Sequence, residues 1–121
     1  WDGLLAGKLL LPRCTHCGAW HWPAVWRCGM CGSWDHEWLE RELAGEVFSH
    51  TRTHHRFGGL EHFPLPFSTA LVTLNGLSVR LIGVVEGDET GLRSGAPVTG
   101  RIDHTMFGEA RIPAIRWRLG A

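Results

Sequence analysis

The sequence predicts a mainly β protein in two parts, with a short N-terminal helix and a four-cysteine ribbon followed by a five-stranded barrel of the OB-fold type. Three observations predict this class. Two Cys-x-x-Cys-Gly units lie close to the N-terminus, apolar β-branched runs alternate with turns from residue 45 onward, and an Asn-Gly pair joins two of those runs. The first domain is expected to span residues 1–40, which contain all four cysteines, and the second to span residues 41–121.

Apolar residues at the start of the chain predict its one short helix. Trp1, Leu4 and Leu5 share one helical face over residues 1–7, although Gly3 and Gly7 weaken the helix. Residues 8–13 then predict a strand that leads into the first cysteine pair.

The four cysteines form the most specific motif. Two residues separate Cys14 from Cys17 and Cys28 from Cys31, and a glycine follows each pair. This spacing lets both thiolates of a pair turn toward one ion, and the glycine allows the positive φ that closes the turn. Four thiolates complete the closed tetrahedral shell of a structural zinc site, with no position left for water and no chemistry at the metal.

Two alternatives stay open from the spacing alone: two disulfides or free thiols instead of a metal site, and iron instead of zinc. A metal site favours a reducing compartment, so we expect a cytoplasmic protein. Zinc binding supplies ~10–16 kcal/mol of folding free energy in zinc-finger peptides, which a short segment with little core requires. Three nearby histidines are expected to surround the site without binding the metal: His16, His21 and His36.

Tryptophan is concentrated in the N-terminal part. Six of the seven tryptophans lie in the first 38 residues, and each has ~150–250 Å² of surface to bury. A ribbon has little core, so either some rings cover the barrel while others face a partner protein, or all pack within the chain. A stacking platform for single-stranded nucleic acid is a third interpretation. The six residues are Trp1, Trp20, Trp22, Trp26, Trp34 and Trp38.

Five runs predict the strands of the barrel. Residues 45–54 alternate with period two and predict a half-buried strand. Two Gly and two Pro predict a long loop over residues 55–66, and Asn75-Gly76 predicts a hairpin turn in which both residues have positive φ. The other strands are expected at residues 67–74, 77–85, 97–103 and 112–118, with a turn region at 87–95. Five strands with one such hairpin suit a small Greek-key barrel such as the OB-fold.

A basic, histidine-rich stretch follows the first barrel strand. Alternation places His50, Arg52 and His54 on one face, where they form either an anion site for a phosphate-bearing ligand or a solvated strand surface. The sequence contains no nucleophile elbow, paired carboxylates or phosphate-cradling glycine loop, so we expect no catalytic residue. The stretch comprises His50, Arg52, His54, His55, Arg56 and His62.

Composition and charge describe an ordinary small globular chain. Its 121 residues are 44% apolar and 20% charged, which suits one domain or two small ones. Twelve Lys and Arg balance twelve Asp and Glu, so the chain has no net charge to attract nucleic acid or an anionic membrane. No apolar run approaches the ~18 residues of a transmembrane helix, and no signal peptide is visible. Because the chain begins with Trp1 rather than Met, we expect it to be trimmed, processed or cut from a longer protein.

Taken together, these motifs resemble a known family over nearly the whole chain. The family combines a rubredoxin-like zinc ribbon with an OB-fold, accompanies thiolase-like acyl-CoA enzymes, and was long known only as a domain of unknown function. The resemblance is carried by Trp-x-Gly-Leu-x-x-Gly-Lys-Leu at residues 1–9, the two cysteine pairs with Trp22-Pro23 between them, Gly-x-Val-Phe-Ser at 45–49 with Thr51, Pro66-Phe67, and Leu-x-x-Gly-x-x-Val at 92–98. The loop at residues 55–66 departs from the family's proline-rich version.

The resemblance implies a non-catalytic accessory subunit. It would bind and support a thiolase-like enzyme of the lipid-transfer-protein type acting on acyl-CoA, for example in retro-aldol cleavage of a steroid side-chain CoA thioester. The chain would have no chemistry of its own but would be essential to a heteromeric aldolase or acyltransferase, expected as a heterotetramer of two plus two. Some family members are fused behind a hydratase-like domain, which fits a chain starting at Trp1. The expected partner interface comprises Trp1, Leu4, Leu5, Trp20, Trp22 and Trp26.

Two other functions remain as alternatives. A stand-alone acyl-CoA-binding protein would place Arg52, His54 and Arg56 near the CoA phosphates. A single-stranded nucleic-acid-binding module has only the analogy of the fold in its favour, and the balanced charge argues against it.

Overall fold

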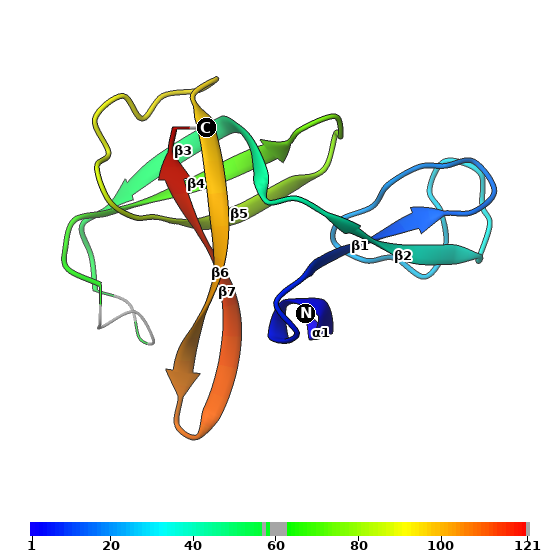
Figure 1. The fold of residues 1–121 in the computed structure, drawn as a ribbon, viewed down its shortest axis with the longest axis horizontal. Coiled ribbons are helices and arrows are strands. Elements are labelled where there is room, and N and C mark those ends of the chain that lie inside the picture. Colours follow the sequence, from blue (N-terminus) through cyan, green and yellow to red (C-terminus); the bar gives the residue numbers. More distant parts are fainter. Residues whose placement is uncertain (57, 59–62, 121) are drawn as a thin grey trace.

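The computed structural model describes residues 1–56, 58 and 63–120, and it begins with a short helix and a two-stranded sheet. Helix α1 covers Asp2–Leu5, which is shorter than the predicted residues 1–7. Strand β1, Leu9–Cys14, pairs in antiparallel fashion with β2, His36–Arg41. The cysteine ribbon built on β1 and β2 extends from one side of the barrel, and α1 lies in the angle between this ribbon and the β6–β7 hairpin (Figure 1).

Five further strands close into a barrel with the order β3-β4-β5-β7-β6. Neighbouring strands run antiparallel except β5 and β7, which pair in parallel fashion over only two residue pairs. The predicted fold class is confirmed: a mainly β chain with a short N-terminal helix, a cysteine ribbon and a five-stranded barrel. The strands are β3 Ala44–Thr53, β4 Phe67–Leu74, β5 Arg80–Val85, β6 Pro97–Phe107 and β7 Ala110–Leu119.

The β6–β7 hairpin is longer than the sequence predicted. The expected strands at residues 97–103 and 112–118 continue toward each other until only Gly108 and Glu109 separate them. Gly108 has φ +61°, the positive value that tight hairpin turns favour. The hairpin extends well beyond the barrel (Figure 1), because β3 pairs with β6 only at its first residues, Pro97–Thr99.

The hairpin at Asn75-Gly76 is confirmed, but its turn differs from the predicted one. Only Gly76 has positive φ, at +74°, and the N–H of Leu77 donates to the Leu74 carbonyl at 3.1 Å. A positive φ at the third position of a four-residue turn is typical of type II. The next strand therefore begins at Arg80, three residues after the expected start at residue 77.

Strand β3 is less buried than its alternation predicted. Gly45 and Val47 are buried, but the pairing with β4 shifts between Val47 and Ser49, and residues 48–52 are exposed on both faces. A bulge of this kind reorients the following side chains. Exposed Phe48 is covered in part by Arg80, whose guanidinium lies 3.9 Å from the ring centre.

One hydrophobic core joins the ribbon to the barrel. Trp117 is completely buried and belongs to one cluster with apolar residues of β4 and β5. Leu4 of α1 and Leu9 and Leu11 of β1 belong to the same buried cluster. Residues on both sides of the expected boundary at residue 40 therefore share one core, and the division into two domains stays a prediction. Among the described residues, no helix has the length and apolar character needed to cross a bilayer.

Candidate functional site

Two similar turns present the four cysteines. Cys14 is the last residue of β1, and the N–H of Gly18 donates to its carbonyl at 3.0 Å. In the second turn the N–H of Gly32 donates to the Cys28 carbonyl at 2.9 Å. Both glycines have the positive φ that the sequence motif predicted, +79° and +81°. Each Cys-x-x-Cys-Gly unit thus folds as a closed knuckle whose thiols point to a common centre.

The sulfur atoms have the spacing of a tetrahedral metal site. All four Sγ atoms lie within 4.8 Å of one another, and the Cys14–Cys31 and Cys17–Cys28 pairs are each 3.6 Å apart. A zinc–sulfur bond of ~2.3 Å gives an edge of ~3.8 Å in a regular tetrahedron, whereas a disulfide would bring two sulfurs to ~2.05 Å. All four cysteines are free, so the disulfide alternative is wrong and the four residues fit zinc.

The pKa values of the thiols indicate the same requirement for a cation. The backbone N–H of Cys17 lowers the pKa of Cys14 to about 6, and the N–H of Cys31 lowers the pKa of Cys28. The N–H of Ser33 acts in the same direction on Cys31, but burial and the three neighbouring sulfurs outweigh it and raise the pKa of Cys31 to about 12. Four thiolates at this spacing therefore need a positive ion among them.

The metal centre is structural in character. Four cysteine ligands fill a tetrahedral shell and leave no position for water or substrate. His16, His21 and His36 are not part of the cluster that the described residues form.

The tryptophans divide between the core and the surface. Trp20 and Trp22 are partly buried and pack against the shared core, and Arg41 lies 5.2 Å from the centre of the Trp20 ring. Trp26 is 83% exposed on the ribbon. Leu4, which was expected at a partner interface, is only 5% exposed and belongs to the same buried cluster as Leu9, but it also lines the cleft described next, so its interface role stays a prediction.

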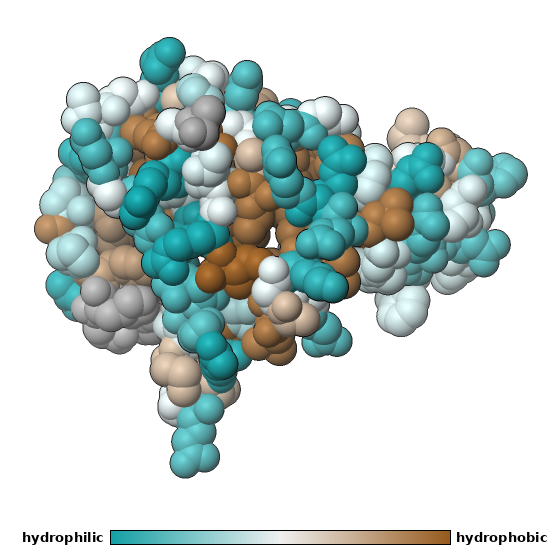
Figure 2. Space-filling model, in the orientation of Figure 1, coloured by the Kyte–Doolittle hydropathy of each residue, from teal (hydrophilic) through white to brown (hydrophobic). Residues whose placement is uncertain are grey.

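An apolar cleft of about 510 Å³ lies between the N-terminal segment and the barrel. Trp1 packs edge-on against Trp22, with 5.8 Å between their ring centres, and both rings line the cleft. Ile82 of β5 lines it as well. Figure 2 shows hydrophobic side chains gathered in the middle of the face where the ribbon joins the barrel. The sequence placed Trp1 and Trp22 at the expected interface but named Trp38 only as one of the six tryptophans, because the β1–β2 pairing could not be inferred from local pattern. It missed Ile82, because the exposed face of β5 could not be inferred either.

The expected anion site is not assembled as a set of free cations. Arg52 forms an ion pair with Glu89 at 3.0 Å, and the hydroxyl of buried Ser68 donates to the same carboxylate at 2.8 Å. His54 and Arg56 are exposed and follow β3 in the loop, and His62 lies outside the described residues. A role for Arg52, His54 and Arg56 in binding CoA phosphates stays a prediction.

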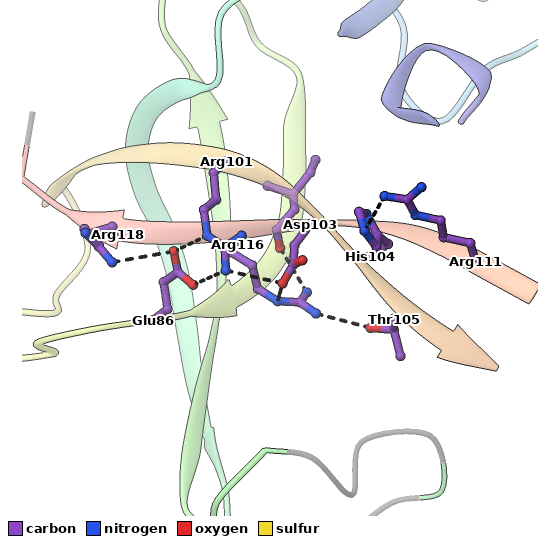
Figure 3. Close-up of polar contacts among 9 residues, drawn as sticks. Glu86, Arg101, Asp103, His104, Thr105, Arg111, Arg116 and Arg118 are labelled. Atoms are coloured by element: carbon purple, nitrogen blue, oxygen red, sulfur yellow. Dashed lines mark hydrogen bonds and ion pairs between the residues drawn. The ribbon is translucent and has the colours of Figure 1, made fainter. Parts of the chain in front are cut away.

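A cluster of ion pairs that the sequence did not reveal lies on β6 and β7. Arg101 binds both carboxylate oxygens of Glu86, at 2.6 and 2.8 Å, and also reaches Asp103 at 3.3 Å (Figure 3). Buried Arg116 lies 3.7 Å from Asp103 and donates to the hydroxyl of Thr105. Because each cation has a carboxylate within reach, this cluster is better suited to joining strands than to binding an anion. The period-two spacing of Arg101 with Asp103 was its only sequence signal.

Comparison with known proteins gives a consistent result. Residues 1–37 match the family model described as ChsH2, rubredoxin-like zinc ribbon domain. Among solved structures, a chain of the Ltp2–ChsH2(DUF35) aldolase superposes with a TM-score of 0.80 and 25% identity, over 99% of this chain and 91% of that chain. A Sulfolobus solfataricus protein of unknown function from the DUF35 family has a TM-score of 0.65 and 22% identity, over 98% of this chain and 81% of that chain. No curated protein matches the sequence.

The resemblance seen in the sequence is therefore confirmed. The knuckle spacing and the free cysteines agree with the family model, and the fold agrees with the solved structures along the chain. The protein carries a ChsH2-type rubredoxin-like zinc ribbon at its N-terminus, and the chain as a whole has the fold of the DUF35 proteins.

Proposed function

We propose that this chain is a non-catalytic accessory subunit that binds and supports a thiolase-like enzyme acting on acyl-CoA. The observation that carries the proposal is the likeness over 99% of the chain to a chain of the Ltp2–ChsH2(DUF35) aldolase. Retro-aldol cleavage of a steroid side-chain CoA thioester is the reaction that this likeness and the family resemblance favour. The catalytic residues would lie on the partner, in agreement with a metal centre that has no open position.

The apolar cleft is the surface that we assign to the partner. Trp1 and Ile82 are each 66% exposed although both line a concave apolar surface. Large exposed apolar patches mark interaction sites in soluble proteins, and tryptophan is enriched at the centres of interfaces. Trp22 also lines this surface, and Leu5 is the neighbour of Leu4, which lines it too. Trp26 is not among the lining residues and would form a second contact on the ribbon.

Other features of the assembly belong to the same proposal. The strand order, with one parallel pair between β5 and β7, supports assigning the barrel to the OB-fold class. We place the domain boundary near residue 40, between the ribbon and β3. Two copies of this chain would bind a dimeric partner to give a heterotetramer in the cytoplasm.

Co-purification tests the proposal directly. The full chain is co-expressed with a thiolase-like protein of the lipid-transfer type, and the expected result is a stable complex in size-exclusion chromatography. Ile82→Glu places a charge on the exposed face of β5 and is expected to abolish co-elution. Phe48→Glu is the matched control, because Phe48 is 51% exposed but does not line the cleft.

Two outcomes would contradict the proposal. If the chain stays monodisperse and forms no complex with any thiolase-like protein tested, the accessory-subunit proposal is contradicted. Calorimetric binding of a CoA thioester by the isolated chain would favour the stand-alone acyl-CoA-binding protein instead. The ion pair between Arg52 and Glu89 counts against that alternative, since a phosphate would have to displace a carboxylate.

A further inference from the structure

An arginine occupies the same place in each cysteine knuckle. Arg13 directly precedes Cys14, and Arg27 directly precedes Cys28, so both units read Arg-Cys-x-x-Cys-Gly. The two knuckles share their backbone hydrogen bonds as well as this sequence, because the N–H of the first cysteine donates to the residue five positions later, at 2.8 Å in both cases. The arginines are therefore structurally equivalent, a feature that the cysteine motif alone does not contain.

Both side chains fold back over the glycine that closes their knuckle. Nη2 of Arg13 lies 2.9 Å from the point where Gly18 would carry a Cβ, and Nη2 of Arg27 lies 2.9 Å from the same point on Gly32. Nε of Arg27 also donates to the Gly32 carbonyl at 2.9 Å. Since Gly18 follows Cys17 and Gly32 follows Cys31, each guanidinium spans its knuckle from the first cysteine to the second.

The two arginines have the opposite charge to the zinc-loaded metal centre. Four thiolates and one Zn²⁺ carry a formal charge of −2, and two guanidinium groups carry +2. Both guanidinium groups lie against the glycine that directly follows a ligand cysteine, and opposite charges near a protein surface attract even when they are partly solvated. The two arginines carry the charge that would offset that of a zinc-loaded centre.

The two arginines differ in whether a carboxylate lies beside them. Arg13 forms an ion pair with Glu37 of β2 at 3.3 Å, so a carboxylate already balances part of its charge. Among the described residues, no carboxylate lies within ion-pair distance of Arg27, whose Nε donates to the backbone carbonyl of Gly32. Glu37 therefore competes with the metal centre at one knuckle only.

We propose that Arg13 and Arg27 are positioning residues that help retain zinc by offsetting the charge of the tetrathiolate centre, with Arg27 the stronger of the two. Lysine at either place would keep the charge but lose the planar group that spans the knuckle. Neutralising Glu37 would release Arg13 to act on the sulfurs.

Competition between the full zinc-loaded chain and a chromophoric chelator measures the effect. Arg27→Gln is expected to weaken zinc retention about three- to tenfold, and Arg13→Gln by less, with both effects shrinking as salt is raised. Arg27→Lys should recover most of the loss. Glu37→Gln should strengthen retention about two- to threefold, opposite in sign to the arginine variants.

The opposite sign of the Glu37 variant keeps the proposal falsifiable. The Arg13–Glu37 pair is partly exposed, so Glu37→Gln is expected to leave the fold intact. The Co²⁺ absorption spectrum of each variant reports whether the tetrathiolate geometry is unchanged. The proposal is overturned if Arg27→Lys loses as much zinc as Arg27→Gln, because the arginine would then be only a mechanical clamp. It is also overturned if Glu37→Gln leaves zinc retention unchanged or lowers it.

Discussion

At the scale of single residues, one buried indole determines which side chains the barrel wall can carry. Trp117 lies in the core with no exposed surface, and two glycines lie against its ring. A Cβ on Gly100 would lie 2.7 Å from Cζ3 of Trp117. A Cβ on Gly83 would meet the Ile115 carbonyl oxygen first and would also lie 3.0 Å from Cδ1 of Trp117. Neither glycine has positive φ, so it is space rather than backbone conformation that excludes a side chain.

Gly100→Ala tests this packing. The added methyl group would overlap the buried ring, and overpacking of this kind costs about 1–3 kcal/mol of unfolding free energy. Urea denaturation followed by circular dichroism measures the loss. Gly58→Ala is the control, because a Cβ there would contact none of the described residues within 4 Å and φ is not positive. Equal stability of the two variants would mean that the barrel relaxes around Trp117.

Residues whose role is local could be predicted from the sequence, and those whose role depends on distant neighbours could not. The four cysteines and their closing glycines lie a few positions apart, so the spacing alone indicated the metal site. Trp117 was not singled out, because its burial depends on the register of three strands. The pairing of Arg52 with Glu89 was missed for the same reason, since 37 residues separate them.

At the scale of elements, the parallel contact between β5 and β7 is the shortest pairing in the barrel. It consists of Val84 with Arg116 and Val85 with Trp117. The ion-pair cluster lies directly beside it, because Glu86 follows β5 and binds Arg101 of β6 while Arg118 of β7 lies 3.8 Å away. Side-chain contacts thus supplement a seam that has few backbone hydrogen bonds.

This cluster makes the free energy of unfolding depend on pH in the acid range. The hydrogen bond from Arg101 lowers the pKa of Glu86, and the N–H of His104 lowers the pKa of Asp103. Both carboxylates therefore stabilise the fold above their ordinary pKa of about 4, and this contribution is lost as pH falls through the lowered values. The measurement is urea unfolding at a series of pH values between neutral and acid. In Arg101→Gln the free energy of unfolding should fall less steeply as pH is lowered. Part of the fall should remain, because the backbone hydrogen bond to Asp103 is still present.

Arg93→Gln is the matched control for the acid experiment. Its guanidinium donates to the Gly91 carbonyl at 3.4 Å, and it forms no ion pair with any residue that the structure describes. The free energy of unfolding of Arg93→Gln should vary with pH as it does in the unmodified chain. If Arg101→Gln gave the same pH dependence, the Arg101–Glu86 ion pair would contribute no stability beside the β5–β7 contact.

Most elements could be predicted, but their lengths depended on pairing. The β4 run was predicted at its observed bounds because apolar residues stand at both ends and apolar or β-branched residues make up most of the positions between them. β2 was not predicted, since its charged and polar residues have no strand character until they pair with β1. The outer parts of β6 and β7 were also missed, because they stabilise each other across the hairpin rather than through a core.

At the scale of the whole molecule, the ribbon and the barrel are joined by shared burial rather than by a flexible linker. Leu11 of β1 is completely buried in the same cluster as Val72 of β4 and Leu81 of β5. The position of Leu11 depends on β1, which ends at Cys14. Zinc binding to the ribbon is therefore expected to stabilise the barrel as well, through the packing of β1.

Removal of zinc with a strong chelator is expected to destabilise both parts at once. Without the ion the knuckles have no core to hold them, so β1 loosens and the buried faces of Leu9 and Leu11 open to water. Hydrogen exchange should then show loss of amide protection in β1 and β2, together with a smaller loss at Val72 and Leu81. Leu11→Ala in the zinc-loaded chain provides a comparison, with an expected cost of about 2–5 kcal/mol. Unchanged protection of β4 and β5 after chelation would show instead that the barrel folds independently of the metal.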